Sequence, residues 1–181
     1  ADLPENVWGI GGHPMAGSEI QGISGADQYL FENAVYLITP GKAPAKQVDR
    51  LMALIEGTGA KTKILDAQTH DELVAIVSHI PHLSAVALVN LTGGDSEHLS
   101  LAAGGFRDTT RIASSNPELW EDILLFNRTY ILKQLDEFTV KLKEMRESKR
   151  AGDRAELLGI LHQAKDIRDK IPQAKKGLIP S

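Results

Sequence analysis

The chain has 181 residues, and its content of 42% hydrophobic and 24% charged residues supports a packed core and excludes a disordered chain. The net charge of −4 and the pI of 5.9 argue against nucleic-acid partners, because phosphate contacts require a basic excess. The absence of cysteine excludes disulfides and thiolate metal sites. No uninterrupted apolar run reaches the roughly 18 residues that span a membrane, and residues 1–8 lack a signal-peptide pattern, so we expect a soluble, cytoplasmic protein without a membrane partner.

The first third of the chain has an α/β pattern. Short apolar runs over residues 7–12, 34–40 and 61–67 predict three strands. Between the second and third runs, apolar residues follow helical spacing up to Gly57. Strand, helix and strand within about 35 residues form a βαβ unit, which implies parallel strands.

From Asp66 onward the period is helical. We expect Thr69 to cap a helix that ends near the TGG sequence at 92–94. Pro81 should kink this helix. A glycine-rich join over 102–111 follows, and Ser115 or Asn116 then caps a helix that starts at Pro117. The apolar face of the first helix comprises Leu73, Ile76, Val77, Ile80 and Leu83.

The helix that begins at Pro117 is expected to run to about Glu147, and a last helix to span Asp153 to Ile171. Each carries an apolar stripe, and the stripe of the longer helix is heptad-like. The stripes comprise Ile131, Leu135, Phe138, Leu142 and Met145 in the longer helix and Leu157, Leu161, Ala164, Ile167 and Ile171 in the last. A stripe of this kind can form a dimer interface where packing within the chain leaves it uncovered.

His13 lies in the glycine-rich sequence GIGGHPMAGSE (9–19), just past the first predicted strand. Loops at the carboxyl ends of strands form the ligand crevice of open α/β sheets. A histidine in such a loop can act as a general base near neutral pH. A surface histidine in a turn is the alternative interpretation.

Two histidines, His79 and His82, share one face of the first helix, and Ser78 lies one turn before His82. His70 and Asp71 lie two turns earlier. The set lacks an HExxH pattern and a third ligand at a fixed offset, so it does not predict a metal site. Histidines that pack within the helical core are the alternative.

In GGFRDTTR (104–111), Asp108 falls between Arg107 and Arg111. An arginine that an acidic neighbour orients is suited to bind a carboxylate with both nitrogens. An ion pair at a helix start is the alternative. With one histidine base and no cysteine, nucleophile elbow or P-loop, the set favours redox or proton-transfer chemistry on a small carboxylate.

Four blocks in series resemble the prephenate dehydrogenase family, which includes arogenate dehydrogenases. The blocks are GGHPMAGSE, LFENAVYLITP, HDELVAIVSHIPH and GGFRDTTRIASSNPELWEDI, and the resemblance covers about Trp8 to Asn127. It implies oxidative decarboxylation of prephenate to 4-hydroxyphenylpyruvate with NAD⁺ or NADP⁺. It also implies a fold class: a remnant of a Rossmann-type sheet followed by an all-α dimerisation domain.

The resemblance implies roles for individual residues. His13 would accept the proton of the substrate hydroxyl. Arg111 would bind a substrate carboxylate, and His82, Ser18 and Gly104 would line the substrate site. The remaining implied residues are Glu19 and Asp108 in a supporting ionic network, Ser78, His79 and Trp120 at the pocket, and Gly12 and Pro14 at the edge of the cofactor site.

The sequence also departs from the family pattern. The family begins with a complete nucleotide-binding domain, whereas no GxGxxG fingerprint is present here. We therefore expect residues 1–68 to be the last part of that domain, 69–172 to be a helical substrate-binding and dimerisation domain, and 173–181 to be a linker. This chain alone should not catalyse the reaction. A non-catalytic interaction module derived from the family remains an alternative, and a β-hydroxyacid dehydrogenase fits the His13 loop less well.

Overall fold

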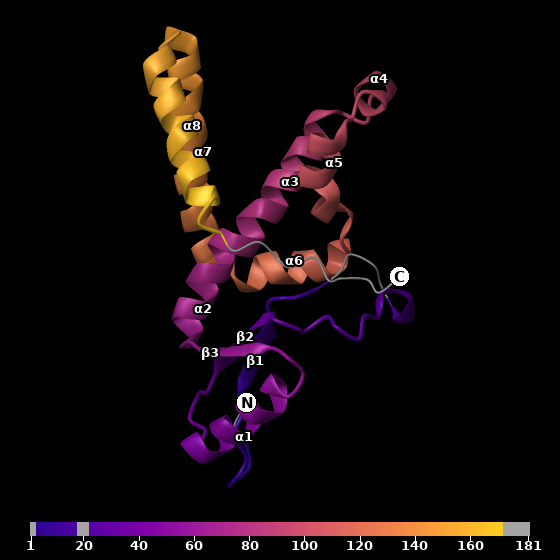
Figure 1. Cartoon of the computed structure of the whole chain (residues 1–181), viewed down its shortest axis with the longest axis vertical. Helices are drawn as coiled ribbons and strands as arrows, with labels where there is room; N and C mark the ends of the chain where they lie inside the picture. Colours follow the sequence, from indigo (N-terminus) through magenta and orange to yellow (C-terminus); the bar gives the residue numbers. More distant parts are fainter. Residues whose placement is uncertain (1–2, 18–21, 172–181) are drawn as a thin grey trace. The chain divides into compact units, whose positions relative to one another are not determined.

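The computed structural model describes residues 3–17 and 22–171. The chain divides into two compact units, with the division between Gln134 and Leu135. The first unit holds a three-stranded sheet and most of the helices, and the second is a helical hairpin (Figure 1). A small sheet followed by a predominantly helical region confirms the expected fold class. The expected linker at 173–181 lies outside the described residues.

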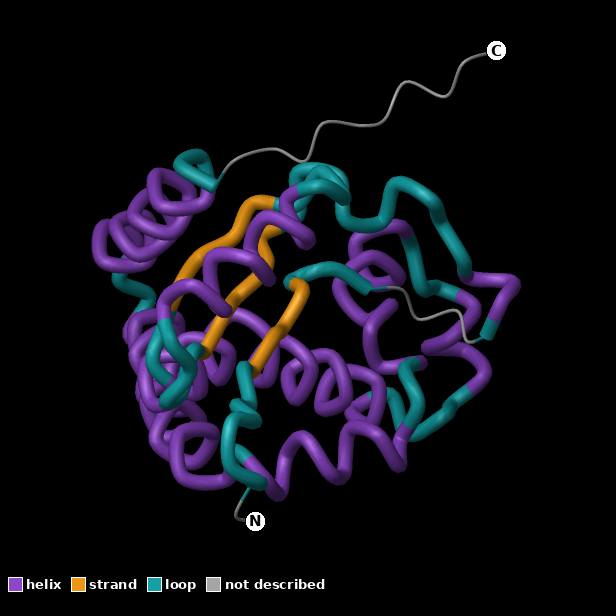
Figure 2. Tube along the Cα trace, turned by 90° about the horizontal axis from the view of Figure 1, so that it is seen from below, coloured by secondary structure: helices purple, strands orange, loops and turns teal. Residues whose placement is uncertain are grey.

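The sheet has the strand order β1 (Gly11–Pro14), β2 (Val35–Thr39) and β3 (Lys61–Ile64), which lie side by side in Figure 2. Strands β2 and β3 are parallel and are joined through helix α1 (Ala45–Glu56), which confirms the βαβ unit. The fully buried Ile38 packs there with a cluster formed by Val48, Ile55 and Ala60. This apolar cluster fixes α1 against the sheet.

Strand β1 differs from the prediction in both position and direction. The first strand was expected over 7–12, but β1 spans Gly11–Pro14 and is antiparallel to β2, with His13 opposite Leu37. His13 therefore lies within a strand and not in a loop beyond it. Gly12 allows close packing here, because a Cβ atom at this position would lie 2.9 Å from the ring of Tyr36. A short 3₁₀ turn, Ile23–Gly25, occupies the connection to β2.

Helix α2 (Ala67–Val74) begins directly after β3, and its cap is Asp66 instead of the expected Thr69. The Asp66 carboxylate accepts hydrogen bonds from the backbone N–H and the hydroxyl of Thr69, at 2.8 and 2.6 Å. A carboxylate at this position satisfies an unpaired N–H of the first turn. The cap sets the start of the helix that carries His70 and Asp71.

A π-helical turn, Ala75–His79, joins α2 to α3 (Ile80–Leu91) directly before Pro81. The extra residue of a π turn rotates all later side chains relative to a regular helix. The expected apolar face is consequently wrong in part, since Leu73, Ile76 and Val77 are exposed. The buried side chains are those of Val74, Ala75, His79, Ile80, His82 and Ala85. The π turn thus brings two histidines into the interior.

The continuous helix Ala67–Leu91 is long and apolar enough to cross a membrane by composition, with a mean hydropathy of 1.6 in its most apolar window. The helix reaches this average although polar residues, among them Ser78, His79 and His82, interrupt its apolar sequence. The core helix of a soluble protein meets the same criterion, and this helix packs on β2, α5 and the 3₁₀ turn after α5. His70, Asp71 and His79 of the helix also line a cavity. We assign it as the central helix of the first unit.

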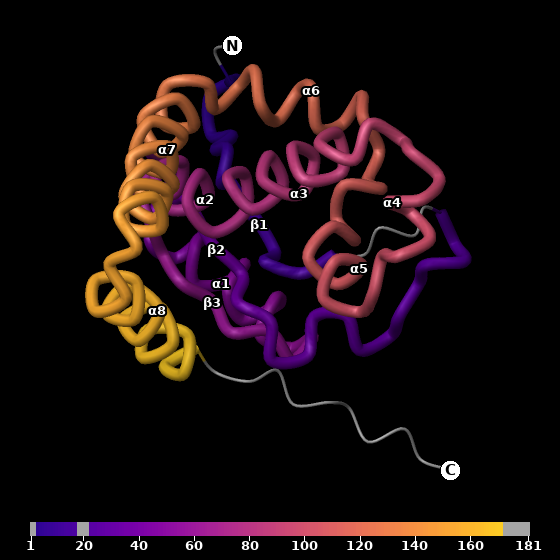
Figure 3. Tube along the Cα trace, turned by 90° about the horizontal axis from the view of Figure 1, so that it is seen from above, coloured from indigo at the N-terminus to yellow at the C-terminus, as the bar shows by residue number. Residues whose placement is uncertain are grey.

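The expected glycine-rich join is mostly helical. A short helix α4 (Ser96–Ser100) follows α3, and α5 (Gly104–Thr110) continues into a 3₁₀ turn, Arg111–Ser114. Helix α5 lies beside α3 in two views (Figures 1 and 3). This contact carries Arg111 to the central helix.

The long helix expected from Pro117 to Glu147 is divided into α6 (Pro117–Phe126) and α7 (Arg128–Ala151). Asn116 caps α6 through its side chain, as one of the two expected caps. The division falls at Asn127, which is 8% exposed and donates a hydrogen bond to the backbone oxygen of Asp71. This hydrogen bond from Asn127 to another helix explains why the helical sequence is divided at this residue.

In the second unit, α7 ends at Ala151, and the next residue, Gly152, has a φ of +67°, which suits a left-handed helix end. Helix α8 (Arg154–Arg168) starts at its cap Asp153, as expected, and turns back. The buried Ser148 contacts Asp153 across the turn. Within this hairpin Leu142, Leu161 and Ile167 of the predicted stripes remain about half exposed. Packing inside the hairpin therefore leaves apolar surface uncovered.

Candidate functional site

A cavity of about 580 Å³ lies within the first unit, where β1, the central helix, the 3₁₀ turn after α5 and α6 meet. Its polar lining includes His13 from β1, His70 and Asp71 from α2, and Arg111 from the 3₁₀ turn. His79 and Trp120 also line it. A cavity with a few convergent polar groups is the usual form of a small-molecule site.

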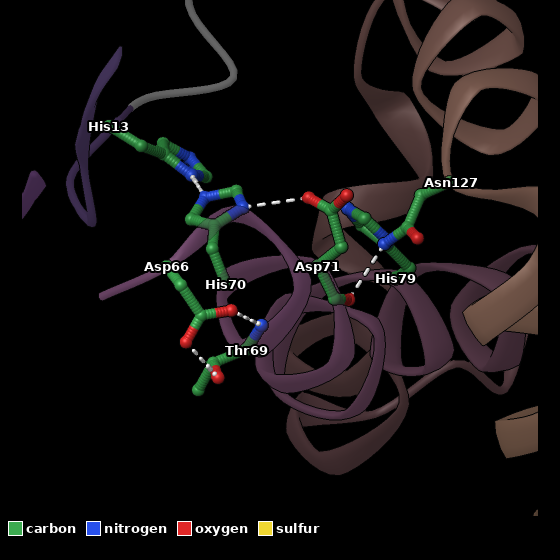
Figure 4. Close-up of polar contacts among 7 residues, drawn as sticks. All are labelled: His13, Asp66, Thr69, His70, Asp71, His79 and Asn127. Atoms are coloured by element: carbon green, nitrogen blue, oxygen red, sulfur yellow. Dashed lines mark hydrogen bonds and ion pairs between the residues drawn. The ribbon is translucent and has the colours of Figure 1, made fainter. Parts of the chain in front are cut away.

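His13, His70 and Asp71 form a continuous row of hydrogen-bonded side chains (Figure 4). The Nδ1 atom of His13 lies 2.8 Å from Nε2 of His70, and Nδ1 of His70 lies 2.8 Å from Oδ1 of Asp71. Partial burial and, secondarily, the nearby charge of His70 lower the pKa of His13 from its ordinary value of 6.5. His13 is therefore largely neutral at pH 7 and able to accept a proton.

His79 is held by Asn127 on the opposite side of Asp71 (Figure 4). The Asn127 amide nitrogen donates to the backbone oxygen of Asp71 at 2.8 Å and lies 3.3 Å from Nδ1 of His79. Because a carbonyl oxygen can only accept, the amide orientation is fixed, and its second hydrogen points to Nδ1. Burial first, and then the charge of His13, lower the pKa of His79. Neutral His79 with Nδ1 as acceptor carries its hydrogen on Nε2, so it can donate to a ligand.

Trp120 of α6 lines the cavity and also contacts His82 of the central helix. Its ring stacks on His82, with the ring centroids 3.5 Å apart and the planes 4° from parallel, and meets His79 edge-on at 6.0 Å. His82 is 5% exposed, and burial lowers its pKa. Its Nδ1 atom has no hydrogen-bond partner among the described residues. His82 therefore supports the cavity wall through Trp120.

A smaller cavity of about 260 Å³ borders the same two histidines, His13 and His70. Gly11, Gly12 and Thr39 also line it, at the start of β1 and the carboxyl end of β2. The carboxyl edge of parallel strands is where open α/β sheets bind nucleotides. His13 thus separates a cavity on the sheet side from the larger cavity on the helical side.

Five of the residues expected at the site line the larger cavity: His13, Ser78, His79, Arg111 and Trp120. Gly12 borders the smaller one, and Pro14 ends β1 opposite Tyr36. His82 lies behind Trp120, and the exposed Gly104 and Asp108 of α5 are not among the lining residues. Ser18 and Glu19 lie outside the described residues. In the described part of the chain, no three histidine or acidic side chains converge as metal ligands.

Two contributions were missed by sequence reasoning, namely the contact of His70 with His13 and the anchoring by Asn127. The sequence pattern indicates His70 and Asp71 only as candidate metal ligands, and it places Asn127 within one long helix. His13 and His70 are separated by 57 residues in the sequence, and Asp71 and Asn127 are separated by 56. The proline directly after SHI was the available signal that the helix period changes near His79.

Two family profiles match consecutive parts of the chain. The description "Prephenate dehydrogenase, nucleotide-binding domain" matches residues 2–64, and "Prephenate dehydrogenase, dimerization domain" matches residues 66–163. The boundary between the two matches falls at the start of the central helix. His13 therefore lies in the first match, whereas His70, His79 and Arg111 lie in the second.

Curated relatives and solved structures agree with these matches. Prephenate dehydrogenase of Bacillus subtilis is 43% identical over 99% of this chain and 50% of its own length. Cyclohexadienyl dehydrogenase of Zymomonas mobilis is 33% identical over 80% of this chain and 51% of its own length. The chain thus spans about half the length of the curated relatives it matches.

Among solved structures, prephenate dehydrogenase from Aquifex aeolicus in complex with hydroxyphenyl propionate and NAD⁺ aligns with a TM-score of 0.82 and 32% identity. The alignment covers 90% of this chain and 59% of that one. Arogenate dehydrogenase from Synechocystis aligns with a TM-score of 0.77 and 34% identity over 89% and 60%. From the matched profiles and the agreement in fold, the chain belongs to the prephenate dehydrogenase family.

Proposed function

We propose that this chain forms the substrate site of an enzyme that oxidatively decarboxylates prephenate to 4-hydroxyphenylpyruvate with NAD⁺ or NADP⁺. The observation that carries the proposal is the shared cavity, which a neutral histidine from the sheet and an arginine from the helical region both line. The relative from Aquifex aeolicus, whose complex contains hydroxyphenyl propionate and NAD⁺, supports the assignment. In this proposal residues 1–68 belong to the nucleotide-binding domain and 69–172 to the helical domain.

The residues of the cavity divide the chemistry between them. His13 accepts the proton of the substrate hydroxyl as the C–H bond on the same carbon breaks, and decarboxylation then makes the ring aromatic. Arg111 holds a substrate carboxylate through two parallel N–H donors. His79 donates from Nε2 to a substrate oxygen, while His82 and Trp120 keep the wall in place. Ser18 and Ser78 are proposed to contact substrate, and Glu19 and Asp108 to hold Arg111 in an ionic network. Gly104 does not line the cavity and is assigned no substrate contact.

The smaller cavity fits one end of a dinucleotide cofactor. Gly11 and Gly12 present bare backbone there, and a Cβ atom at Gly11 would lie 3.3 Å from Cβ of Thr39. Gly12 and Pro14 are therefore proposed to border the cofactor. When bound, the nicotinamide supplies the hydride acceptor. His13 borders both cavities, which supports its proposed role at the carbon that loses both the hydroxyl proton and the hydride.

The test is turnover by a full-length enzyme that contains this chain. Addition of prephenate should produce NADH or NADPH and 4-hydroxyphenylpyruvate in equal amounts, followed by absorbance and chromatography. The chain of 181 residues alone should give no turnover, because it spans about half the length of its curated relatives and contains no GxGxxG fingerprint. Absence of turnover by the full-length enzyme with both prephenate and arogenate would leave the non-catalytic module as the better assignment. Turnover with arogenate alone would make it an arogenate dehydrogenase, like the Synechocystis relative.

We also propose that the protein forms a homodimer through its helical domain. Support comes from the matched profile, which is described as a dimerization domain, and from the apolar side chains that remain exposed on the α7–α8 hairpin. Burial of such a stripe against a second copy removes apolar surface from water. Light scattering at micromolar concentration should give twice the mass of the chain. A monomeric mass would exclude this mode of assembly.

A further inference from the structure

The row formed by His13, His70 and Asp71 constrains where its protons lie (Figure 4). The side chain of His70 is 20% exposed and that of Asp71 is 46% exposed, and all three side chains line the larger cavity. An ionised carboxylate can only accept, and therefore Nδ1 of His70 carries the hydrogen of that contact. In neutral His70 this leaves Nε2 without a hydrogen.

The direction of the hydrogen bond between His13 and His70 follows from that of the contact between His70 and Asp71. A bare Nε2 on His70 must accept, so Nδ1 of His13 donates across their 2.8 Å contact. Neutral His13 then has a lone pair on Nε2 and no hydrogen there. The opposite arrangement would place a hydrogen on Nε2 of His13 and leave no lone pair for a substrate proton. Only the first arrangement suits a base in the cavity.

We propose that Asp71 and His70 are positioning residues that hold His13 in the tautomer with hydrogen on Nδ1 and a free lone pair on Nε2. The catalytic consequence rests on the proposed function, whereas the tautomer itself does not. The arrangement places the proton-accepting nitrogen of His13 on the side of the ring away from His70. The other charged or titratable groups that line the same cavity are His79 and Arg111.

The tautomer can be measured directly in the 181-residue chain. With ¹⁵N-labelled histidine, long-range ¹H–¹⁵N correlation spectra at about pH 8 distinguish a protonated from a bare ring nitrogen in neutral imidazole. The His13 signals are those lost in the His13→Gln variant. The expected result is a protonated Nδ1 and a bare Nε2. A hydrogen on Nε2 of wild-type His13 would overturn the proposal.

Asp71→Asn tests the origin of the tautomer. An asparagine can donate to His70, which moves the His70 hydrogen to Nε2 and reverses His13 as well. The backbone oxygen of Asp71, which binds Asn127, is unchanged by this substitution. The matched control is Glu72→Gln, because Glu72 lies on the same helix and contacts Gln68 instead of a histidine. A His13 tautomer that stays unchanged in Asp71→Asn would exclude Asp71 from this role.

The functional readout is separate from the spectroscopic one. In a full-length enzyme, Asp71→Asn should lower kcat by about 10²-fold or more with little change in KM, because a general base in the wrong tautomer cannot accept the proton. Glu72→Gln should keep wild-type kcat. If the wild-type enzyme has no activity while the tautomer is as expected, the proposed function fails and the positioning proposal stands. An unchanged kcat in an active Asp71→Asn enzyme would refute the catalytic consequence.

Discussion

His13→Gln is expected to lower kcat for prephenate oxidation by about 10²- to 10⁴-fold in a full-length enzyme that contains this chain, the range for loss of a general base. Glutamine has a similar size and keeps a hydrogen-bonding group beside His70, but it cannot accept the hydroxyl proton. The substrate carboxylate contact through Arg111 remains, so KM should change much less than kcat. Initial rates of NADH formation at saturating substrate measure the effect.

His98→Gln is the matched control, because His98 lies on α4 and is not among the residues that line the cavity. It should keep the wild-type kcat. A His13→Gln enzyme with wild-type kcat would remove His13 from the mechanism.

The pH profile provides a second readout of the same residue. His13 must be neutral to act as a base, so kcat/KM should fall as the pH decreases through the pKa of His13 in the free enzyme. Partial burial and the charge of His70 lower this pKa, which places the acid limb of the profile below pH 6.5. The value of kcat/KM should therefore be constant from about pH 6.5 through neutral pH. The acid limb should be absent from the residual activity of His13→Gln.

The parts of the fold that follow from local sequence could be predicted. The βαβ unit of β2, α1 and β3 depends on apolar spacing that ends at glycines, and the starts of α6 and α8 depend on capping residues next to them in the chain. Asp66 shows the limit of such reasoning, because the sequence predicted Thr69 as the cap of α2, whereas Asp66 caps it and Thr69 donates to the Asp66 carboxylate.

The predictions that were wrong concern features of the fold that depend on contacts between distant segments of the chain. Asn127 ends α6 because its amide binds Asp71 on another helix, and no local signal distinguishes this asparagine from one on a helix surface. Similarly, the π turn before Pro81 rotates His79 towards the cavity and His82 behind Trp120. A regular helix with the same sequence would place the two histidines differently. The identity of the site residues was thus accessible from motifs, whereas their division into lining and supporting groups was not.

Arg111→Ala is expected to weaken binding of prephenate about 10- to 100-fold, because a hydrogen bond to a charged group contributes about 1.5–3 kcal/mol. Arg111 lies on the 3₁₀ turn after α5 and lines the cavity with His13. Calorimetric titration of the full-length enzyme measures the dissociation constant. Arg107→Ala is the matched control, since this exposed arginine lies one turn earlier on α5 and does not line the cavity.

The kinetic pattern of Arg111→Ala should be the reverse of that of His13→Gln. A carboxylate is bound in the ground state and remains bound until carbon dioxide or the product leaves, so its contact with Arg111 contributes to substrate and transition state alike. KM should therefore rise by the same factor as the dissociation constant, with kcat changed less. Arg111→Lys should recover only part of the affinity, because an ammonium keeps the charge but cannot form two parallel hydrogen bonds. Unchanged affinity in Arg111→Ala would place the carboxylate elsewhere in the cavity and leave the base assigned to His13 unaffected.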